Sequence, residues 1–505
     1  MRSKKAIKNI IVSVFQQVIT LICGLIIPRA IIETFGSSVN GLIASITQFL
    51  SYIVLLEAGV GPVIKAVLYK PIAQKNKNQI ERILKAGERF FRIIALIFVV
   101  YLIALCFIYP LIVKGEFETG YTISLILIIS VSTFSEYFFG MVYRLYLQAE
   151  QKTYITALIQ ILTTILNAIF VITFIKLGSD IQLVKLVSAF TYVLRPILQN
   201  IYVKKKYNID LRNVNERYEL KQKWDGLAQH IASVVHNNTD VAILTIFTNT
   251  IEVSVYTVYL FVVNGVKNLI QSLTSGIDAT FGDMIAKDER DNLNRSFKIY
   301  ELFYFTIITI IFSITTVMIL PFVKVYTRGV TDTNYYRPVF AILITIAELV
   351  WSIRQPYNEL IKAAGHFKQT QIGAWIESGT NLLISTILVF KFGIIGVAIG
   401  TLISMSIRTI EFMYYTSKNI LKREQKENIK RVMLLITEMI IIVPLEFFIS
   451  KYISVDTYFN CIILALIEGI IVTIIVGIIT AIIYKKDFKN LLNMVINIFR
   501  RKEEN

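Results

Sequence analysis

The chain has 505 residues, of which 55% are apolar and only 17% are charged, a balance that excludes an assembly of ordinary soluble domains. Its mean hydropathy is +0.62 and its formal net charge is +17. The apolar residues lie in nearly continuous blocks, long enough to cross a hydrocarbon layer of about 30 Å as helices and unlike the alternating strands of a β-barrel. The chain is therefore predicted to be an all-α polytopic membrane protein.

Apolar blocks separated by charged clusters or by Gly, Asn and Ser turns predict fourteen transmembrane helices. The first seven are expected near residues 10–32, 42–68, 93–113, 121–143, 154–175, 181–203 and 226–248. The other seven are expected near 253–277, 302–323, 338–361, 372–392, 394–415, 432–449 and 459–484. The eleventh and twelfth are separated only by Phe392-Gly393.

The distribution of Lys and Arg predicts the orientation, because short cytoplasmic loops are enriched in these residues. If the N-terminus is cytoplasmic, 39 of the 52 basic residues lie on the inside and seven on the outside. Both termini are therefore expected in the cytoplasm. The positive charge then reflects topology and contact with anionic membrane lipids, and no nucleic-acid partner is predicted.

An internal repeat divides the chain. Residues 148–178 resemble residues 362–393, which sets Asn167 against Asn381 at an offset of six spans. The predicted architecture is an N-lobe of six helices (1–203), a cytoplasmic linker (204–225), a C-lobe of six helices (226–417) and a C-terminal helix pair with a basic tail (418–505). Because six is even, the lobes insert in the same orientation and can enclose a central cavity, which suits alternating access.

Charged residues within the spans are the candidate functional groups, since each is costly in hydrocarbon unless it pairs, snorkels or faces water. Arg29 either snorkels to the outer interface or grips phosphate in a cavity. Lys267 and Asp240 both lie near the midplane, either as a structural ion pair or as a pair that exchanges for substrate or ions. Glu57 lies at a similar depth, and Arg354 lies nearer the cytoplasmic side.

Other intramembrane charges favour structural roles. Arg195 and Arg408 are close to repeat-equivalent and are interpreted as pins for span ends, and Glu438, Glu446 and Glu468 belong to the C-terminal pair. The sequence has no phosphate-binding loop, metal-ligand spacing or nucleophile elbow. No catalytic residue, metal or cofactor is therefore predicted, and transport would draw on an ion gradient, the membrane potential or the substrate's own gradient.

Three short motifs carry a family resemblance. FGSSVNGL at 35–42, EAGVG at 57–61 and QAEQK at 148–152 resemble the polysaccharide-biosynthesis flippases of the multidrug/oligosaccharidyl-lipid/polysaccharide (MOP) exporter superfamily. The resemblance implies two six-helix lobes, as in multidrug exporters, with the extra helix pair serving a lipid tail. It implies a non-enzymatic flippase that moves undecaprenyl-diphosphate-linked oligosaccharide across the bacterial cytoplasmic membrane for capsule, O-antigen or exopolysaccharide synthesis. A polysaccharide polymerase and glycosyltransferases are further partners on this reading.

The resemblance also assigns roles to individual residues. Arg29, Lys267 and Arg354 are expected to bind the diphosphate or acidic sugars. Peptidoglycan-precursor flippases of the superfamily hold sodium with an Asp on span seven and an Asn–Asp pair four residues apart on span eleven. Asp240 and Asn381 match that pattern, whereas Ser385 replaces the second Asp. The residues expected to couple transport to Na⁺ or H⁺ are Asp240, Glu377, Asn381 and Glu57. Glu377, one turn before Asn381, is the candidate that compensates for the missing second Asp.

Three alternatives stay open. Within the same class, the chain could be a peptidoglycan-precursor flippase or a teichuronic-acid exporter. From another class, it could be a membrane polysaccharide polymerase, although the longest predicted outer loop, 324–337, holds a single acid, Asp332.

Overall fold

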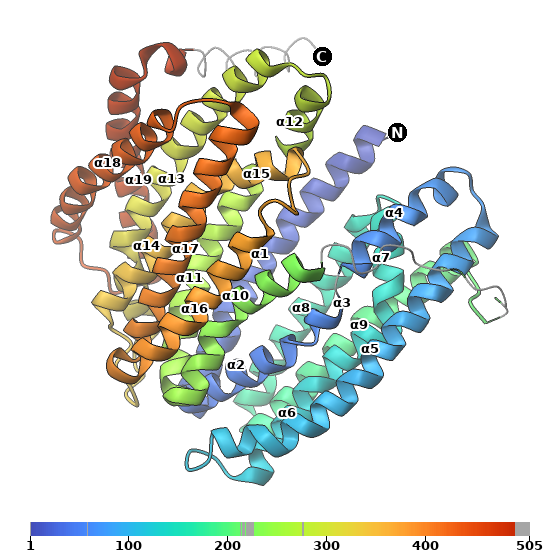
Figure 1. Ribbon diagram of the computed structural model, residues 1–505. Helices are drawn as coiled ribbons and strands as arrows, with labels where there is room; N and C mark the ends of the chain where they lie inside the picture. The colour runs from blue at the N-terminus through green and yellow to red at the C-terminus, as the bar shows by residue number, and fades with distance from the viewer. Residues whose placement is uncertain are drawn as a thin grey trace. The chain divides into compact units, whose positions relative to one another are not determined.

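The computed structural model describes residues 2–57, 59–212, 214, 218, 227–274 and 277–489 (Figure 1). These residues are helical throughout, with turns and short connections and one isolated bridge between Lys114 and Phe117. The all-α prediction is confirmed. Half of the predicted linker 204–225 and the basic tail beyond residue 489 lie outside the described residues.

The chain forms two compact units, Met1–Ser254 and Val255–Asn505. The division falls near the start of α11 (Thr250–Thr274), so α10 (Leu227–Phe247) belongs to the first unit. There α10 packs on α2 (Ser37–Ser51) and α3 (Val54–Glu57).

The first unit contains the other helices up to residue 207. These are α1 (Arg2–Phe35), α4 (Val60–Ala73), α5 (Lys77–Ile112), α6 (Thr119–Ser135), the π-helical turn η1 (Glu136–Gly140), α7 (Met141–Ala149), α8 (Thr153–Lys176) and α9 (Ile181–Tyr207). The second predicted span is interrupted at Gly59, whose φ of 77° is left-handed and therefore suits glycine. Its two pieces are α2–α3 and α4.

The second unit contains α12 (Ile277–Ala286), α13 (Arg290–Tyr326), α14 (Pro338–Ile353), α15 (Gln355–Ala363), α16 (Gln371–Phe392), α17 (Ile394–Tyr415), the π-helical turn η2 (Thr416–Leu421), α18 (Lys426–Ser450) and α19 (Tyr458–Ile483). The boundary predicted at Phe392-Gly393 is confirmed, because Gly393 has a φ of 54° between α16 and α17. The tenth predicted span breaks at Arg354, where Pro356 has no N–H to donate to the carbonyl of Ser352.

Thirteen of the described helices are long and apolar enough to cross a membrane. The seventh predicted span corresponds to α10, whose described apolar stretch is Asn238–Phe247. On α19 the face formed by Ile470, Ile474 and Ile478 is more than half exposed, while Val472 and Val476 are fully buried. This division is expected for a helix that faces lipid on one side and protein on the other.

The repeat that the sequence indicates has matching contacts in both units. Asn167 of α8 donates to the hydroxyl of Tyr192 on α9 at 2.9 Å, and Asn381 of α16 donates to the hydroxyl of Thr401 on α17 at 3.0 Å. A buried Asn thus ties the fifth span to the sixth and the eleventh to the twelfth. Such a hydrogen bond satisfies a polar group that lipid cannot.

Candidate functional site: charged residues within the spans

Lys267 of α11 forms an ion pair with Glu348 of α14. Its Nζ lies 3.2 Å from Oε2 of Glu348 and 4.2 Å from the ring centroid of Trp351, a cation–π distance. The lysine side chain is 16% exposed, whereas Glu348 is 5% exposed. The cation is therefore the partly accessible member of the pair, seated between a carboxylate and an indole ring.

Sequence reasoning singled out Lys267 but not Glu348. Within the second unit the carboxylate that contacts the lysine is that of Glu348. The signal was present, because Glu348 is the only charged residue between Pro338 and Ile353. A lone acid in an apolar helix needs a counter-charge or a hydrogen-bond partner, as a lone lysine does.

Arg354 and Glu377 form a second, more deeply buried pair. Nη1 of Arg354 donates to Oε1 of Glu377, and the two side chains are about 10% exposed. Oε2 of Glu377 lies 3.7 Å from Nε of Arg408, whose Nη1 in turn donates to Glu411 at 2.6 Å. Two arginines and two glutamates thus neutralise one another within α14–α17.

This cluster joins residues that the sequence analysis assigned to separate roles, Arg354 to substrate binding and Glu377 to ion coupling. Arg408 also donates to the carbonyl oxygen of Thr370 at 2.7 Å, which fits the predicted structural pin. Its repeat counterpart Arg195 donates to the hydroxyls of Thr163 and Thr164, at 2.7 and 2.8 Å. Each arginine ties one span to the span before it.

In the first unit, Arg29 lies 3.7 Å from Glu33, one turn along α1. Its side chain is 21% exposed and that of Glu33 is 66% exposed. A contact of this length between partly exposed groups adds little stability. Arg29 is therefore a partly accessible cation.

Asp240 is buried on α10, and its charge acts on the hydroxyl of Tyr52. Two residues earlier, α10 is held to the end of α2 by two contacts of Asn238. The hydroxyl of Tyr52 donates to its carbonyl oxygen at 3.0 Å, and Gln48 donates to its side-chain oxygen. Asp240 is thus placed beside a polar, hydrogen-bonded patch.

Glu57 ends α3 immediately before the left-handed Gly59. Its carboxylate is in hydrogen-bonding contact with Tyr137 of η1, and its Oε1 lies 3.2 Å from where a Cβ on Gly61 would be. The EAGVG motif therefore places an acid at a helix break, with small residues making room for it.

Asn381 is fully buried on α16, and its side-chain oxygen accepts no hydrogen bond from any described residue. Ser385, one turn later, donates weakly to the carbonyl of Val397 at 3.3 Å. Its hydroxyl lies 2.1 Å from where a Cβ on Gly400 would be, so α16 and α17 approach closely here. Position 385 has room for a small side chain only.

We therefore expect Ser385→Asp, which restores the sodium-site pattern of the peptidoglycan-precursor flippases, to destabilise this protein by about 3 kcal/mol or more, because it buries an unpaired charge in a tight contact. Thermal unfolding of the purified protein measures the effect, with Ser385→Ala as the control. A Ser385→Asp protein as stable as wild type, and further stabilised by Na⁺, would contradict this reading.

The C-terminal helices are anchored by charges that sequence reasoning missed. Glu301 of α13 is 1% exposed and accepts hydrogen bonds from Arg423 at 2.6 Å and from the hydroxyl of Tyr357 at 2.7 Å. Arg431 of α18 lies 3.9 Å from Glu301 and 3.6 Å from Asp487. Glu301 lies next to the charged 287–298 segment in sequence, so nothing in the local pattern marked it as buried.

Comparison with solved structures identifies the class of fold. The lipid II flippase MurJ, in an inward closed conformation, superposes with a TM-score of 0.67 at 16% identity, over 95% of this chain and 99% of the flippase. An inward-facing multidrug resistance MATE transporter of the MOP superfamily gives 0.62 at 15% identity, over 81% and 95%. The Vibrio cholerae MATE transporter VcmN gives 0.56 at 14% identity, over 84% and 98%.

No family model and no curated protein matches the sequence. The structural neighbours are therefore what place the chain: it has the helical fold shared by the lipid II flippase MurJ and the MATE transporters of the MOP superfamily.

Proposed function

We propose that the chain is a flippase that moves undecaprenyl-diphosphate-linked oligosaccharide units across the bacterial cytoplasmic membrane, for capsule, O-antigen or exopolysaccharide synthesis. It works by alternating access without ATP and without catalysis. The observation that carries the proposal is the partly exposed Lys267 between Glu348 and Trp351. An anionic diphosphate can displace the carboxylate and accept the same charge-assisted hydrogen bonds.

The extent of the structural match supports a lipid-linked substrate. The MurJ superposition covers 95% of this chain, while the first MATE superposition covers 81%. The part left out by the MATE transporter is close in length to the predicted C-terminal segment 418–505. A helix pair beyond twelve spans offers a surface for a lipid tail that a soluble drug does not need.

The predicted binding residues differ in how free they are to act. Lys267 and Arg29 are partly exposed, with side-chain exposures of 16% and 21%, so we place them first. Arg354 would reach substrate only after its buried pair with Glu377 opened. For a coupling cation, we propose Asp240 and Asn381, with Glu57 and Glu377 as further candidates.

The proposal includes the placement of the chain. Both termini lie in the cytoplasm, in line with the distribution of basic residues. A polymerase and glycosyltransferases of the same pathway are the proposed protein partners, because the translocated unit is made on one side of the membrane and consumed on the other.

The test is the leaflet distribution of lipid-linked oligosaccharide in cells that lack the protein. Complete units are expected to accumulate on the cytoplasmic side, and wild type should restore their translocation. Lys267→Ala is expected to lower the rate about tenfold or more, because a hydrogen bond to a charged group contributes about 1.5–3 kcal/mol.

The matched control is Lys287→Ala, which removes a lysine paired with Asp283 at 2.7 Å on the exposed surface. It should translocate like wild type. If complete units reach the outer leaflet in the deletion strain and stay unpolymerised, the protein is a polymerase. If only peptidoglycan precursors accumulate inside, it is the peptidoglycan-precursor flippase that its MurJ-like fold also suits.

A further inference from the structure

Three carboxyl groups lie inside the contact between the C-terminal helices and α13. Glu438 and Glu446 are eight residues apart on α18, and Ile442 lies midway between them. These three residues of α18 therefore lie on one helix face. Glu468 of α19 is close enough for its charge to act on Glu446. Glu446 and Glu468 are fully buried and Glu438 is 3% exposed. None of the three faces lipid.

The surroundings of Glu446 and Glu468 are apolar. Ile442 packs with Val472 and Val476 of α19, and this cluster contacts Ile310 and Ile314 of α13. All four carboxyl oxygens of the two glutamates are buried and make no hydrogen bond to any described residue. Two ionised carboxylates cannot remain in such a place without a bound positive charge.

The helices that pack here supply no such charge at this depth. On α13 the sequence between Glu301 and Lys324 contains no charged residue. On α18 the only charged groups between Arg431 and the end of the helix are Glu438 and Glu446, and on α19 the only one is Glu468. The positive charge must therefore come from a bound ion.

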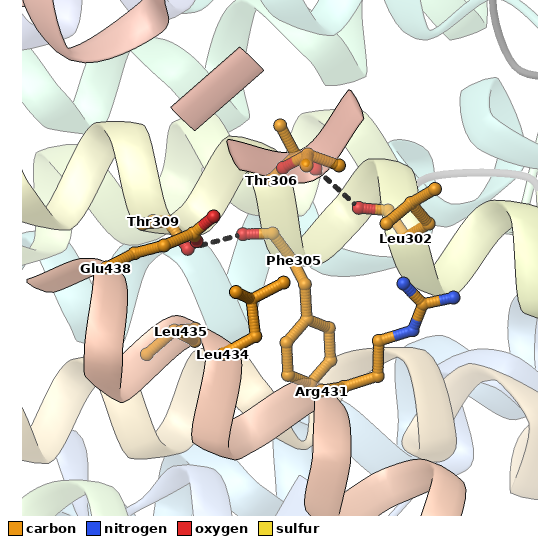
Figure 2. Close-up of a pocket in the computed structure, with 9 residues that line it drawn as sticks. Leu302, Phe305, Thr306, Thr309, Arg431, Leu434, Leu435 and Glu438 are labelled. Carbon is orange, nitrogen blue, oxygen red and sulfur yellow. Dashed lines mark hydrogen bonds between the residues drawn. The ribbon is translucent and has the colours of Figure 1, made fainter. Parts of the chain in front are cut away.

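The third glutamate, Glu438, has polar neighbours and lies on the side of Arg431. Glu438 is hydrogen-bonded to Thr309 and Thr480, and Figure 2 shows its carboxylate beside the Thr309 hydroxyl in a pocket that Arg431 also lines. The pocket has room for about one water molecule. Ser313 lies one turn beyond Thr309 on the same face of α13, fully buried and with a hydroxyl that has no described hydrogen-bond partner.

We propose that Glu446 and Glu468 form a proton-binding site, with Glu438, Ser313 and the water-sized pocket as its connection toward Arg431. Two protons neutralise both carboxyl groups, whereas one sodium ion would leave a net negative charge in hydrocarbon. No group of three or more His, Cys, Asp or Glu side chains suited to a metal occurs among the described residues. The role of this site is to couple translocation to the proton gradient. That role rests on the proposed transport function, whereas proton binding itself does not.

Infrared spectroscopy of the purified full-length protein tests the site without substrate. A protonated carboxyl group has a C=O stretching band distinct from the bands of the carboxylate. Wild type is expected to show such a band at neutral pH that falls reversibly as the pH is raised. Replacing K⁺ with Na⁺ at constant pH should leave the band unchanged.

Glu446→Gln and Glu468→Gln should each remove part of the titrating band, because glutamine keeps the shape of the side chain and loses the carboxyl group. Glu424→Gln, at an exposed position between η2 and α18, is the control and should match wild type. If the variants fail to fold, the spectrum of the wild-type protein still tests the proposal. The absence of a titrating carboxyl band in wild type, or the loss of that band in Na⁺, overturns the proposal. Neither result bears on translocation, which the leaflet assay measures separately.

Discussion

Replacing Glu377 with alanine is expected to lower the free energy of unfolding by about 3–5 kcal/mol, because it leaves a buried arginine without its counter-charge. Arg354 is 8% exposed, and its carboxylate partner in the structure is Glu377. Arg408 is less affected, since it keeps Glu411 at 2.6 Å and the carbonyl of Thr370 at 2.7 Å. Thermal and denaturant unfolding in detergent measure the change.

A double-mutant cycle separates the pair from its surroundings. Arg354→Met combined with Glu377→Leu should recover much of the loss, because replacing both charges with apolar groups leaves no buried ion. Asp283→Ala, which breaks the exposed pair with Lys287, serves as the control and should cost less than about 1 kcal/mol. A Glu377→Ala protein no less stable than the control would show that water reaches Arg354.

Gly41→Ala is expected to destabilise the first unit by about 2–3 kcal/mol, because the new methyl group has no space. A Cβ at this position would lie 1.7 Å from the carbonyl oxygen of Thr250 and 3.0 Å from the backbone nitrogen of Ser254. The obstacle is backbone, so no side-chain rotation relieves it and α2 must move away from α11. That movement also strains the hydrogen bond of 2.8 Å from Asn40 to Ser254.

Gly379→Ala is the matched control, since no atom lies within 4 Å of the Cβ it would add to α16. It should stabilise the protein by roughly 0.5–1 kcal/mol, because alanine loses less conformational freedom in a helix than glycine. Unfolding of both variants under the same conditions gives the comparison. Equal stabilities for the two would mean that α2 and α11 are less closely packed than the structure shows.

The prediction of the spans was accurate because their cause is local. Blocks of apolar residues, the break at Phe392-Gly393 and the buried Asn167 and Asn381 can all be read along the chain. The helices α5 and α13 begin earlier in the chain than predicted, because their first turns are charged and carry no hydropathy signal. The interruption of the second span at Gly59 was also missed, although the glycine that permits it was noted.

Ion-pair partners were the harder part of the site. Lys267 and Glu348 are 81 residues apart, and Arg354 and Glu377 are 23 apart on different helices. Sequence alone showed that each charge needs a partner in a membrane, but several acids stood at comparable depth. Only the packing of α11 on α14 and of α14 on the α16–α17 pair selected one of them.

The sequence by itself determined that this is an all-α membrane protein and where most of its helices run, because transfer of apolar segments from water is a property of each segment. The tertiary structure alone decided which charges are engaged and which stay accessible. It joined Arg354 to Glu377, left Lys267 partly open, and enclosed Glu446 and Glu468 between α13, α18 and α19. Those outcomes depend on which helix faces meet, and the energy of a buried charge is set by the groups that surround it.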